Sequence, residues 1–388
     1  MSEPGIAASI GEWITLEPGA TEDRARFVMG LAEQLTLRGI PLWRLRYALM
    51  SMHPEVLWRS VLWSRRDGVS VIDQPHARLG DAFYTASPVA VVRSSGSSLR
   101  VRLEPGELPF ALCTELREQG GTDFYAMPLP FSNGQVSYAT FVTDSPAGFT
   151  DSMLALLDGI VPYLARRIEL ESAYYATRGL LEVYLGKNAA RRVLAGEFQR
   201  GRGELIEAAI WFSDMRGFTK LSDRLSPARV VELLDAHFEL IVGAVSEHGG
   251  EVLKFIGDAV LAIFPLASDP RDACRRALAA AARTFEGLAR ANEGLVSAGE
   301  APTEIGVALH SGAVMYGNVG GRDRLDFTVI SSAVNEASRL ESMCKSLRTP
   351  LALSQRFVEV AELQDVEDLG EQELRGVRAP LRVFTVRF

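Results

Sequence analysis

The order of the predicted elements in the C-terminal half constrains the fold of this chain more than any other feature. A strand-like apolar run is followed by a helical pattern, and then by two strand-like runs separated only by Gly257-Asp258. Such a dipeptide between apolar runs predicts a tight hairpin. A long helical pattern and one more strand complete the order β-α-β-β-α-β, which predicts an α+β, ferredoxin-like (split βαβ) domain. The six segments are 205–212, 227–248, 251–256, 259–264, 269–295 and 303–310.

The first 150 residues are predicted to form a separate domain of mixed α/β type. A helical pattern covers 21–37, and four strand-like runs follow it. Two of these runs flank Ser132-Asn133-Gly134, and Asn-Gly is a strong signal for a hairpin turn. The four runs are 56–63, 68–72, 124–129 and 136–142.

A connecting helix and a linker are predicted between these two domains. Five apolar residues recur at spacings of three and four, so they form one stripe along a helix that Thr150 or Asp151 can cap. We expect Gly179 and Gly186 to interrupt this helix. The stripe consists of Leu154, Leu157, Ile160, Leu164 and Ile168. The predicted divisions of the chain are 1–150, 151–203 and 204–388.

Composition is that of an ordinary globular protein and argues against some partners. Of the 388 residues, 47% are hydrophobic and 23% charged. The 49 acidic and 41 basic residues leave a net charge of −8, which disfavours nucleic-acid binding. No apolar run is long enough to predict a membrane span, and the start lacks the pattern of a signal peptide. We therefore expect a cytoplasmic protein without a disulfide framework, since Cys113, Cys274 and Cys344 are far apart.

Two acidic residues next to strand-like segments are candidates for a metal site. Asp214 follows the first apolar run of the C-terminal half, and Asp258 lies in the predicted hairpin turn. In a split βαβ sheet these positions can lie side by side. Neighbouring carboxylates repel each other unless a proton or a cation lies between them, and a pair of Mg²⁺ ions suits such oxygen ligands. The alternative is that Asp258 is only a turn residue, since Gly-Asp is common in turns.

Two other groups of residues are candidates for contacts with a phosphorylated ligand. Gly217 lets the backbone approach a ligand, and a helix that starts at Phe218 and Thr219 offers N–H groups to phosphate. Asn335 and Arg339 are four residues apart and share one helix face, where they could orient a sugar and stabilise a phosphoryl transition state. The alternatives are an ordinary strand-to-helix turn and a solvated helix face.

In their order and spacing, five runs of the 204–388 region resemble the catalytic domain of class III adenylate and guanylate cyclases. The resemblance implies that Asp214 and Asp258 bind two Mg²⁺ or Mn²⁺ ions, with the Met215 carbonyl as a further ligand. It implies that Asn335 and Arg339 position the ribose and stabilise the reacting phosphorus. The runs are Phe212–Thr219, Lys254–Ala259, Asn318–Gly320, Asp326–Ile330 and Val334–Leu340.

Two positions depart from the pattern of this family. Arg375 stands where the family usually has a lysine that contacts the terminal phosphates, and it keeps the positive charge. Ser331-Ser332 stands where the family commonly has Gly-Asp or Gly-Pro, and we expect these serines to cap the following helix.

The resemblance also identifies the two residues that read the base. Lys254 is a donor that suits the N1 acceptor of adenine, and Thr328 can accept from the adenine amine. This pair resembles adenylate cyclases that carry threonine at the second position. The implied reaction is the conversion of ATP to 3′,5′-cyclic AMP and pyrophosphate by attack of the ribose 3′-hydroxyl on the α-phosphate. The alternatives are a guanylate cyclase and a silent nucleotide-binding homologue.

Two expectations about assembly and regulation also follow from family resemblance. The active sites of the family form between two catalytic domains, and this chain carries one domain with both sets of residues, so the resemblance implies a homodimer. Phe149-Thr150-Asp151 followed by an apolar-periodic helix resembles the C-terminal helix of GAF-type sensor domains, which implies a small-molecule or other signal at 1–150. The five histidines show no metal-ligand spacing, and we expect His237 and His248 to be surface residues.

Overall fold

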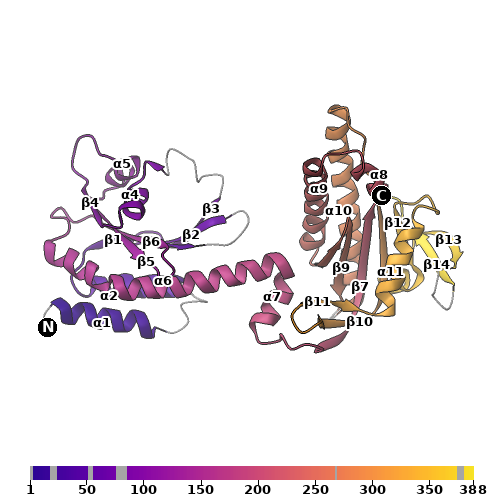
Figure 1. Cartoon of the computed structure of the whole chain (residues 1–388), viewed down its shortest axis with the longest axis horizontal. Helices are drawn as coiled ribbons and strands as arrows, with labels where there is room; N and C mark the ends of the chain where they lie inside the picture. The colour runs from indigo at the N-terminus through magenta and orange to yellow at the C-terminus, as the bar shows by residue number, and fades with distance from the viewer. Residues whose placement is uncertain (1–2, 18–23, 51–55, 76–84, 267–268, 374–379) are drawn as a thin grey trace. The chain divides into compact units, whose positions relative to one another are not determined.

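The computed structural model describes residues 3–17, 24–50, 56–75, 85–266, 269–373 and 380–388. The chain divides into two compact units, Met1–Val183 and Tyr184–Phe388. Each unit is built on one sheet that is covered by helices on both faces (Figure 1). In the described part of the chain, no helix has a stretch that is both long and apolar enough to cross a membrane.

The first unit contains a six-stranded antiparallel sheet in the order β3-β2-β1-β6-β5-β4. The predicted hairpin at Ser132-Asn133-Gly134 is confirmed, because it joins β5 to β6 and Gly134 has a φ of 82°. One face of the sheet packs against α1, α2 and α6, and the other packs against α4 and α5. The elements are α1 (Glu3–Leu16), α2 (Arg24–Thr36), β1 (Leu42–Met50), β2 (Val56–Ser64), β3 (Gly68–Pro75), α4 (Pro88–Ser95), β4 (Leu99–Arg102), α5 (Ala111–Glu118), β5 (Asp123–Pro130), β6 (Val136–Thr143) and α6 (Asp151–Leu185).

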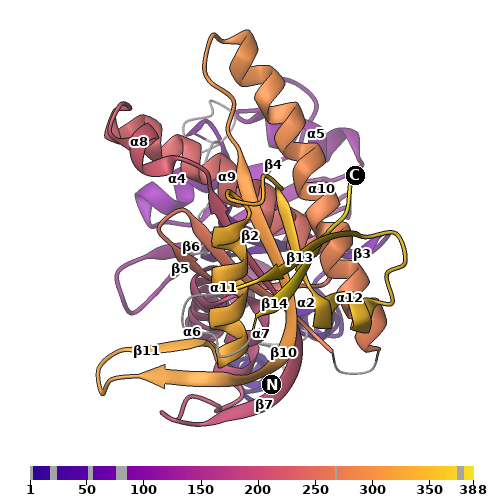
Figure 2. The ribbon, with the colours of Figure 1, turned by 90° about the vertical axis from the view of Figure 1, so that its right-hand side faces the viewer.

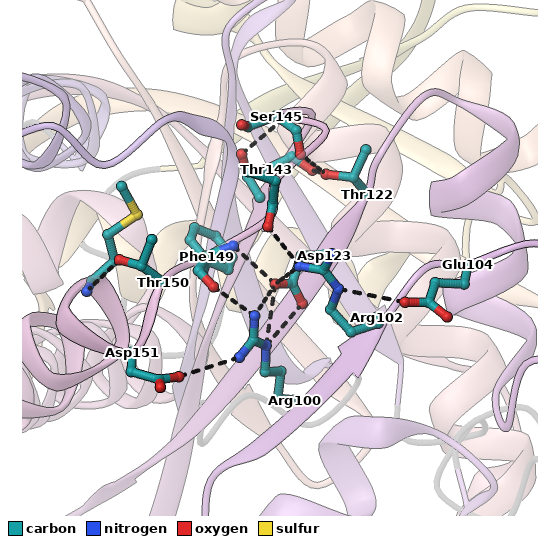
Figure 3. A network of polar contacts seen from close by, with 12 residues as sticks. Arg100, Arg102, Glu104, Thr122, Asp123, Thr143, Ser145, Phe149, Thr150 and Asp151 are labelled. Atoms are coloured by element: carbon teal, nitrogen blue, oxygen red, sulfur yellow. Dashed lines mark hydrogen bonds and ion pairs between the residues drawn. The ribbon is translucent and has the colours of Figure 1, made fainter.

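A buried carboxylate anchors the start of α6 to this sheet (Figure 3). Asp123, at the beginning of β5, has a side chain with 0% exposure and accepts the backbone N–H of Phe149 at 2.9 Å. Arg100 donates to the same carboxylate at 2.8 Å and to the Phe149 carbonyl at 2.6 Å, and Arg102 donates to it at 3.3 Å. Thr150 accepts the Met153 N–H at 3.3 Å, as expected of a cap. Arg100 and Arg102 therefore compensate the negative charge of the buried Asp123 carboxylate at the start of α6.

The α6 helix passes through one of its two predicted interruptions. We expected Gly179 and Gly186 to interrupt it, but it continues through Gly179 and ends only before Gly186. A glycine inside a helix costs about 1 kcal/mol relative to alanine and does not force a break. Gly186 instead adopts a φ of 86°, which lies outside the helical region, and α7 (Lys187–Leu194) begins after it. The prediction was therefore right for Gly186 and wrong for Gly179.

The second unit contains a sheet in the order β13-β14-β12-β10-β7-β9-β8, and β11 pairs with β10 beside this path. β7 lies between β10 and β9 and is antiparallel to both. β10 and β11 form a long two-stranded arm (Figure 2). The elements are β7 (Gly203–Met215), α8 (Phe218–Ser222), α9 (Pro227–Glu247), β8 (Glu251–Ile256), β9 (Ala259–Pro265), α10 (Pro270–Ser297), β10 (Ile305–Gly320), β11 (Leu325–Ile330), α11 (Ser332–Met343), β12 (Leu351–Ser354), α12 (Gln355–Ala361), β13 (Glu367–Gln372) and β14 (Leu381–Thr385).

Alternation along β7 divides the core of this unit between the two faces of the sheet. Ala209 and Trp211 pack with α9, α10 and α12 on one face. Ala208 and Ile210 pack with α7 and α11 on the other. Because successive side chains of a strand point to opposite faces, the part of β7 that is covered on both sides, residues 208–211, is apolar. The three cysteines are free and buried.

Candidate functional site

The two candidate metal aspartates lie together at one end of the sheet. Asp214 is near the end of β7, and Asp258 is in the turn between β8 and β9. Ser213 pairs with Val260, so the register of β7 and β9 brings the two acids close to each other. The Asp258 carboxylate accepts the backbone N–H of Met215 at 3.2 Å. Both carboxylates are partly buried, and they come from segments more than forty residues apart.

The electrostatics of this pair fit a cation site. Burial, a hydrogen bond with Asp258 and the negative charge of Asp258 raise the pKa of Asp214 to about 7. Without a cation, one proton therefore stays on the pair up to nearly neutral pH. The donor set consists of hard carboxylate oxygens, and Mg²⁺ and Mn²⁺ prefer such ligands. The residues present therefore fit a divalent metal ion.

A third carboxylate near this pair was not singled out from the sequence. Glu341 of α11 is buried, with 8% exposure, and burial together with the negative charges of Asp214 and Asp258 raises its pKa to about 7. The positive charge of Arg216 opposes this shift. The sequence gives little indication that Glu341 belongs to the site. An acidic residue two positions after Arg339 looks like part of an ordinary solvated helix face.

The segment after Asp214 forms the turn that the sequence suggests. Gly217 has a φ of 75°, a left-handed conformation that other residues rarely adopt, and it precedes the short helix α8. Phe218 is half-buried and Thr219 is exposed. Arg216 donates its backbone N–H to the Glu304 carbonyl at 2.8 Å. This contact anchors the turn to the segment that precedes β10.

The two candidate base-reading residues line a common pocket of about 530 Å³. Lys254 comes from β8 and Thr328 from β11, and the structure places them at the same cavity although they are far apart in sequence. Apolar side chains form much of its wall. Pockets that bind small ligands usually measure about 300–1,000 Å³, so this one has a suitable size for a base. The apolar lining residues include Ile256, Leu261, Val329, Ile330 and Val334.

An acidic residue in the same pocket was also missed. Lys254 Nζ donates to the carboxylate of Asp326. Asp326 and Thr328 are two residues apart on β11, and alternate residues of a strand face the same side. The spacing of these two residues was visible in the sequence, but the side-chain contact between β11 and β8 was not.

The remaining candidates lie on α11 or outside the described residues. Asn335 is exposed and Arg339 is half-buried, and both lie on α11. The expected cap is present, because Ser331 Oγ accepts the Val334 N–H at 3.2 Å. Among the described residues that line the base pocket, α11 contributes Val334 but neither Asn335 nor Arg339. Arg375 lies outside the described residues.

The structure corrects the expectation about His237. Its side chain is buried, with 6% exposure, although we expected a surface residue. Burial lowers its pKa, and a hydrogen bond involving Asp258 opposes that shift. His237 is near the hairpin turn because α9 packs over β8 and β9, a tertiary contact that no local pattern shows.

Comparison with known proteins shows what this half of the chain is similar to. Residues 203–387 match the family model described as the adenylate and guanylate cyclase catalytic domain. An uncharacterised protein of Mycobacterium tuberculosis is 38% identical over 207 residues, which cover 51% of this chain and 36% of that protein. Adenylate cyclase 1 of Rhizobium meliloti is 30% identical over 254 residues, which cover 63% of this chain and 38% of that protein.

Solved structures include similar domains. The crystal structure of an adenylyl cyclase from P. aeruginosa shares 24% identity with a TM-score of 0.44, covering 47% of this chain and 94% of that one. The chain spans less than two fifths of the length of the two curated relatives. The family match covers the segment that carries both the carboxylate pair and the base pocket. Residues 203–387 are therefore similar to the adenylate and guanylate cyclase catalytic domain.

Proposed function

We propose that this protein is an adenylate cyclase, which converts ATP to 3′,5′-cyclic AMP and pyrophosphate. The proposal rests on one observation. The carboxylates of Asp214 and Asp258 interact with each other in the same unit that contains the pocket lined by Lys254 and Thr328. The pair fits divalent metal ions, and the pocket offers a cationic donor and a hydroxyl to a base. The similarity to an adenylate cyclase of Rhizobium meliloti agrees with this assignment.

Each site residue then has a distinct task. Asp214 and Asp258, with the Met215 carbonyl, hold the metal ions, and we assign contacts with the phosphates to Gly217, Phe218, Thr219 and Arg375. Two Mg²⁺ or Mn²⁺ ions, when bound, lower the pKa of the ribose 3′-hydroxyl and neutralise phosphate charge. Asn335 orients the ribose for in-line attack on the α-phosphorus. Arg339 donates to the phosphoryl oxygens as negative charge develops on them.

The active form is proposed to be a homodimer whose sites lie between the subunits. One domain carries both sets of catalytic residues, and an isologous dimer would bring the aspartates of one subunit to Asn335 and Arg339 of the other. Exposed apolar side chains near the base pocket support such an interface: Phe255, Ile256 and Ile330 are each about half exposed.

The first unit is proposed to be a GAF-like sensor for residues 1–150, joined to the catalytic domain of 204–388 by the 151–203 connector. Helices cover both faces of its sheet, and the Asp123 anchor holds the start of α6, the helix that continues the chain into the connector. A signal that changes the packing of this unit could therefore change how two catalytic domains meet.

Turnover of ATP and of GTP by the purified full-length protein, with Mg²⁺ or Mn²⁺, tests the proposal. We expect cyclic AMP as the main product and a loss of at least about 10³-fold in Asp258→Ala, because the reaction loses its metal ligand. Asp235→Ala, an exposed acid on α9, is the matched control and should keep full activity. Cyclic GMP as the main product would contradict the adenylate assignment, and no product from a dimeric, metal-loaded protein would contradict the cyclase activity.

A further inference from the structure

Two arginines lie side by side on β1, in the first unit, without an ion-pair partner. Arg44 and Arg46 are two residues apart on the strand, so both point to the face of the sheet that carries α4 and α5. Both are half-buried, and neither forms an ion pair with a carboxylate in the described part of the chain. Partly buried charges are normally paired, so these two neighbouring positive charges need an explanation.

The contacts of Arg46 leave one buried donor unused. Its guanidinium donates to Ser60 Oγ at 2.8 Å and lies 6.0 Å from the centre of the Tyr138 ring. Its Nε atom is buried and has no hydrogen-bond partner among the residues that the structure describes. A buried donor without a partner lowers stability, and a ligand that accepts a hydrogen bond from it recovers that loss.

The electrostatics of Arg44 point in the same direction. Burial and the positive charge of Arg46 lower the pKa of Arg44, and the negative charges of Glu115 and Asp67 oppose this shift. An arginine nevertheless stays protonated under physiological conditions, so the repulsion between the two guanidinium groups is not relieved by the loss of a proton. A bound anion is the remaining way to neutralise them.

The strands on either side of β1 provide hydroxyl groups on the same face. Ser60 of β2 and Thr140 of β6 are buried, with 0% and 5% exposure. Thr140 is the partner of Arg46 in the register of β1 and β6, and Ser60 is paired with Ala48, two residues further along β1. Where α4 and α5 cover this face, the core is apolar. The polar groups are therefore concentrated around the two arginines.

We propose that Arg44 and Arg46, with the hydroxyls of Ser60 and Thr140, bind the phosphate or carboxylate group of a small anionic molecule. The planar fork of a guanidinium matches the oxygens of such a group, and hydroxyls donate to the oxygens that remain. The bound anion neutralises two like charges and links β1 to both neighbouring strands. The inference deepens the sensor role proposed for the first unit, and its regulatory consequence rests on that role.

Titration of the full-length protein with inorganic phosphate and with succinate, followed by tryptophan fluorescence, tests the site. Four of the five tryptophans belong to the first unit, so the signal reports mainly on it. The probe that binds more tightly shows whether the site prefers phosphate or carboxylate. Arg46→Gln should weaken that binding by about 10- to 100-fold, the range for losing a hydrogen bond to a charged group. Arg46→Lys keeps the charge but loses the fork, so it should weaken binding less.

Thermal unfolding separates a binding role from a structural one. In Tris buffer without either probe, Arg44→Gln should raise the unfolding midpoint of the first unit, because it removes one of two like charges. Phosphate stabilises many proteins without a specific site, so the informative value is the extra rise in the wild type over Arg46→Gln. We expect about 2–5 °C at a probe concentration roughly ten times the wild-type Kd. Arg66→Gln, whose native side chain is 89% exposed, is the matched control and should behave like the wild type.

Cyclic AMP formation measured beside binding separates this site from the proposed function. Binding that Arg46→Gln weakens supports the site even if the anion leaves turnover unchanged or no cyclic AMP forms, and those results count against the sensor role or the cyclase activity instead. Equal affinities in the wild type and a folded Arg46→Gln protein would overturn the inference. Failure of the wild type to bind either probe, or a lowered midpoint in Arg44→Gln, would overturn it as well.

Discussion

Repulsion between Asp214 and Asp258 should make the metal-free protein less stable as the pH rises. Unfolded Asp214 loses its proton near its usual pKa of 3.8, whereas the folded protein holds that proton up to a pKa of about 7. Between these values the folded state binds more protons than the unfolded state, so stability decreases as pH increases from about 4 to about 7. Above that window, both carboxylates are ionised in the folded protein and the penalty is complete.

The magnitude follows from the shift and its causes. One pKa unit corresponds to about 1.4 kcal/mol, so the full shift would equal about 4 kcal/mol, and solvent screening of this half-buried group reduces it to about 2 kcal/mol. Burial is the first cause and remains when Asp258 is replaced. We therefore expect Asp258→Asn to restore only about 1 kcal/mol near pH 8, or about 2–4 °C in the melting temperature of a unit of this size. Near pH 5, where Asp214 is protonated, the gain should vanish.

Thermal unfolding of the full-length protein in EDTA, near pH 8 and near pH 5, measures this effect. Mn²⁺ should stabilise the wild type at the higher pH and stabilise Asp258→Asn much less, because metal binding adds stability only where a site exists. Asp235→Asn, on the exposed face of α9, controls for the loss of one negative charge. The reasoning is refuted if Asp258→Asn is no more stable than the wild type near pH 8, or if it gains equally near pH 5.

Two further predictions concern assembly and the first unit. Asp258→Ala and Arg339→Ala subunits should each be inactive, but mixing them should restore about a quarter of wild-type cyclic AMP formation, because half the dimers would carry one intact site between subunits. No recovery from a mixture shown to contain heterodimers would place each site within one chain. Asp123→Asn should lower the unfolding free energy of the first unit by about 3 kcal/mol in urea denaturation, since Arg100 and Arg102 lose their shared carboxylate. Asp144→Asn, whose partner Arg65 is half exposed, should cost less than about 1 kcal/mol, and equal losses in the two variants would count against the anchor.

Local features of this protein were readable from the sequence because short-range chemistry determines them. The Gly257-Asp258 hairpin, the Ser331 cap of α11 and the end of α6 before Gly186 depend on a few neighbouring residues. Gly179 shows the limit of that reasoning, because packing and hydrogen bonding around a long helix outweigh the propensity of one residue.

The proximity of groups that are distant in the sequence was decided by the tertiary structure alone. Strand register brings Asp214 beside Asp258, and helix packing adds Glu341 and buries His237 nearby. The pairing of β11 with β10 places Asp326 against Lys254, which no spacing along the chain predicts. Electrostatic effects depend on distance and burial, and both are properties of the folded chain. The amino-acid sequence supplies the residue types that the chemistry requires, whereas the fold determines which of them interact.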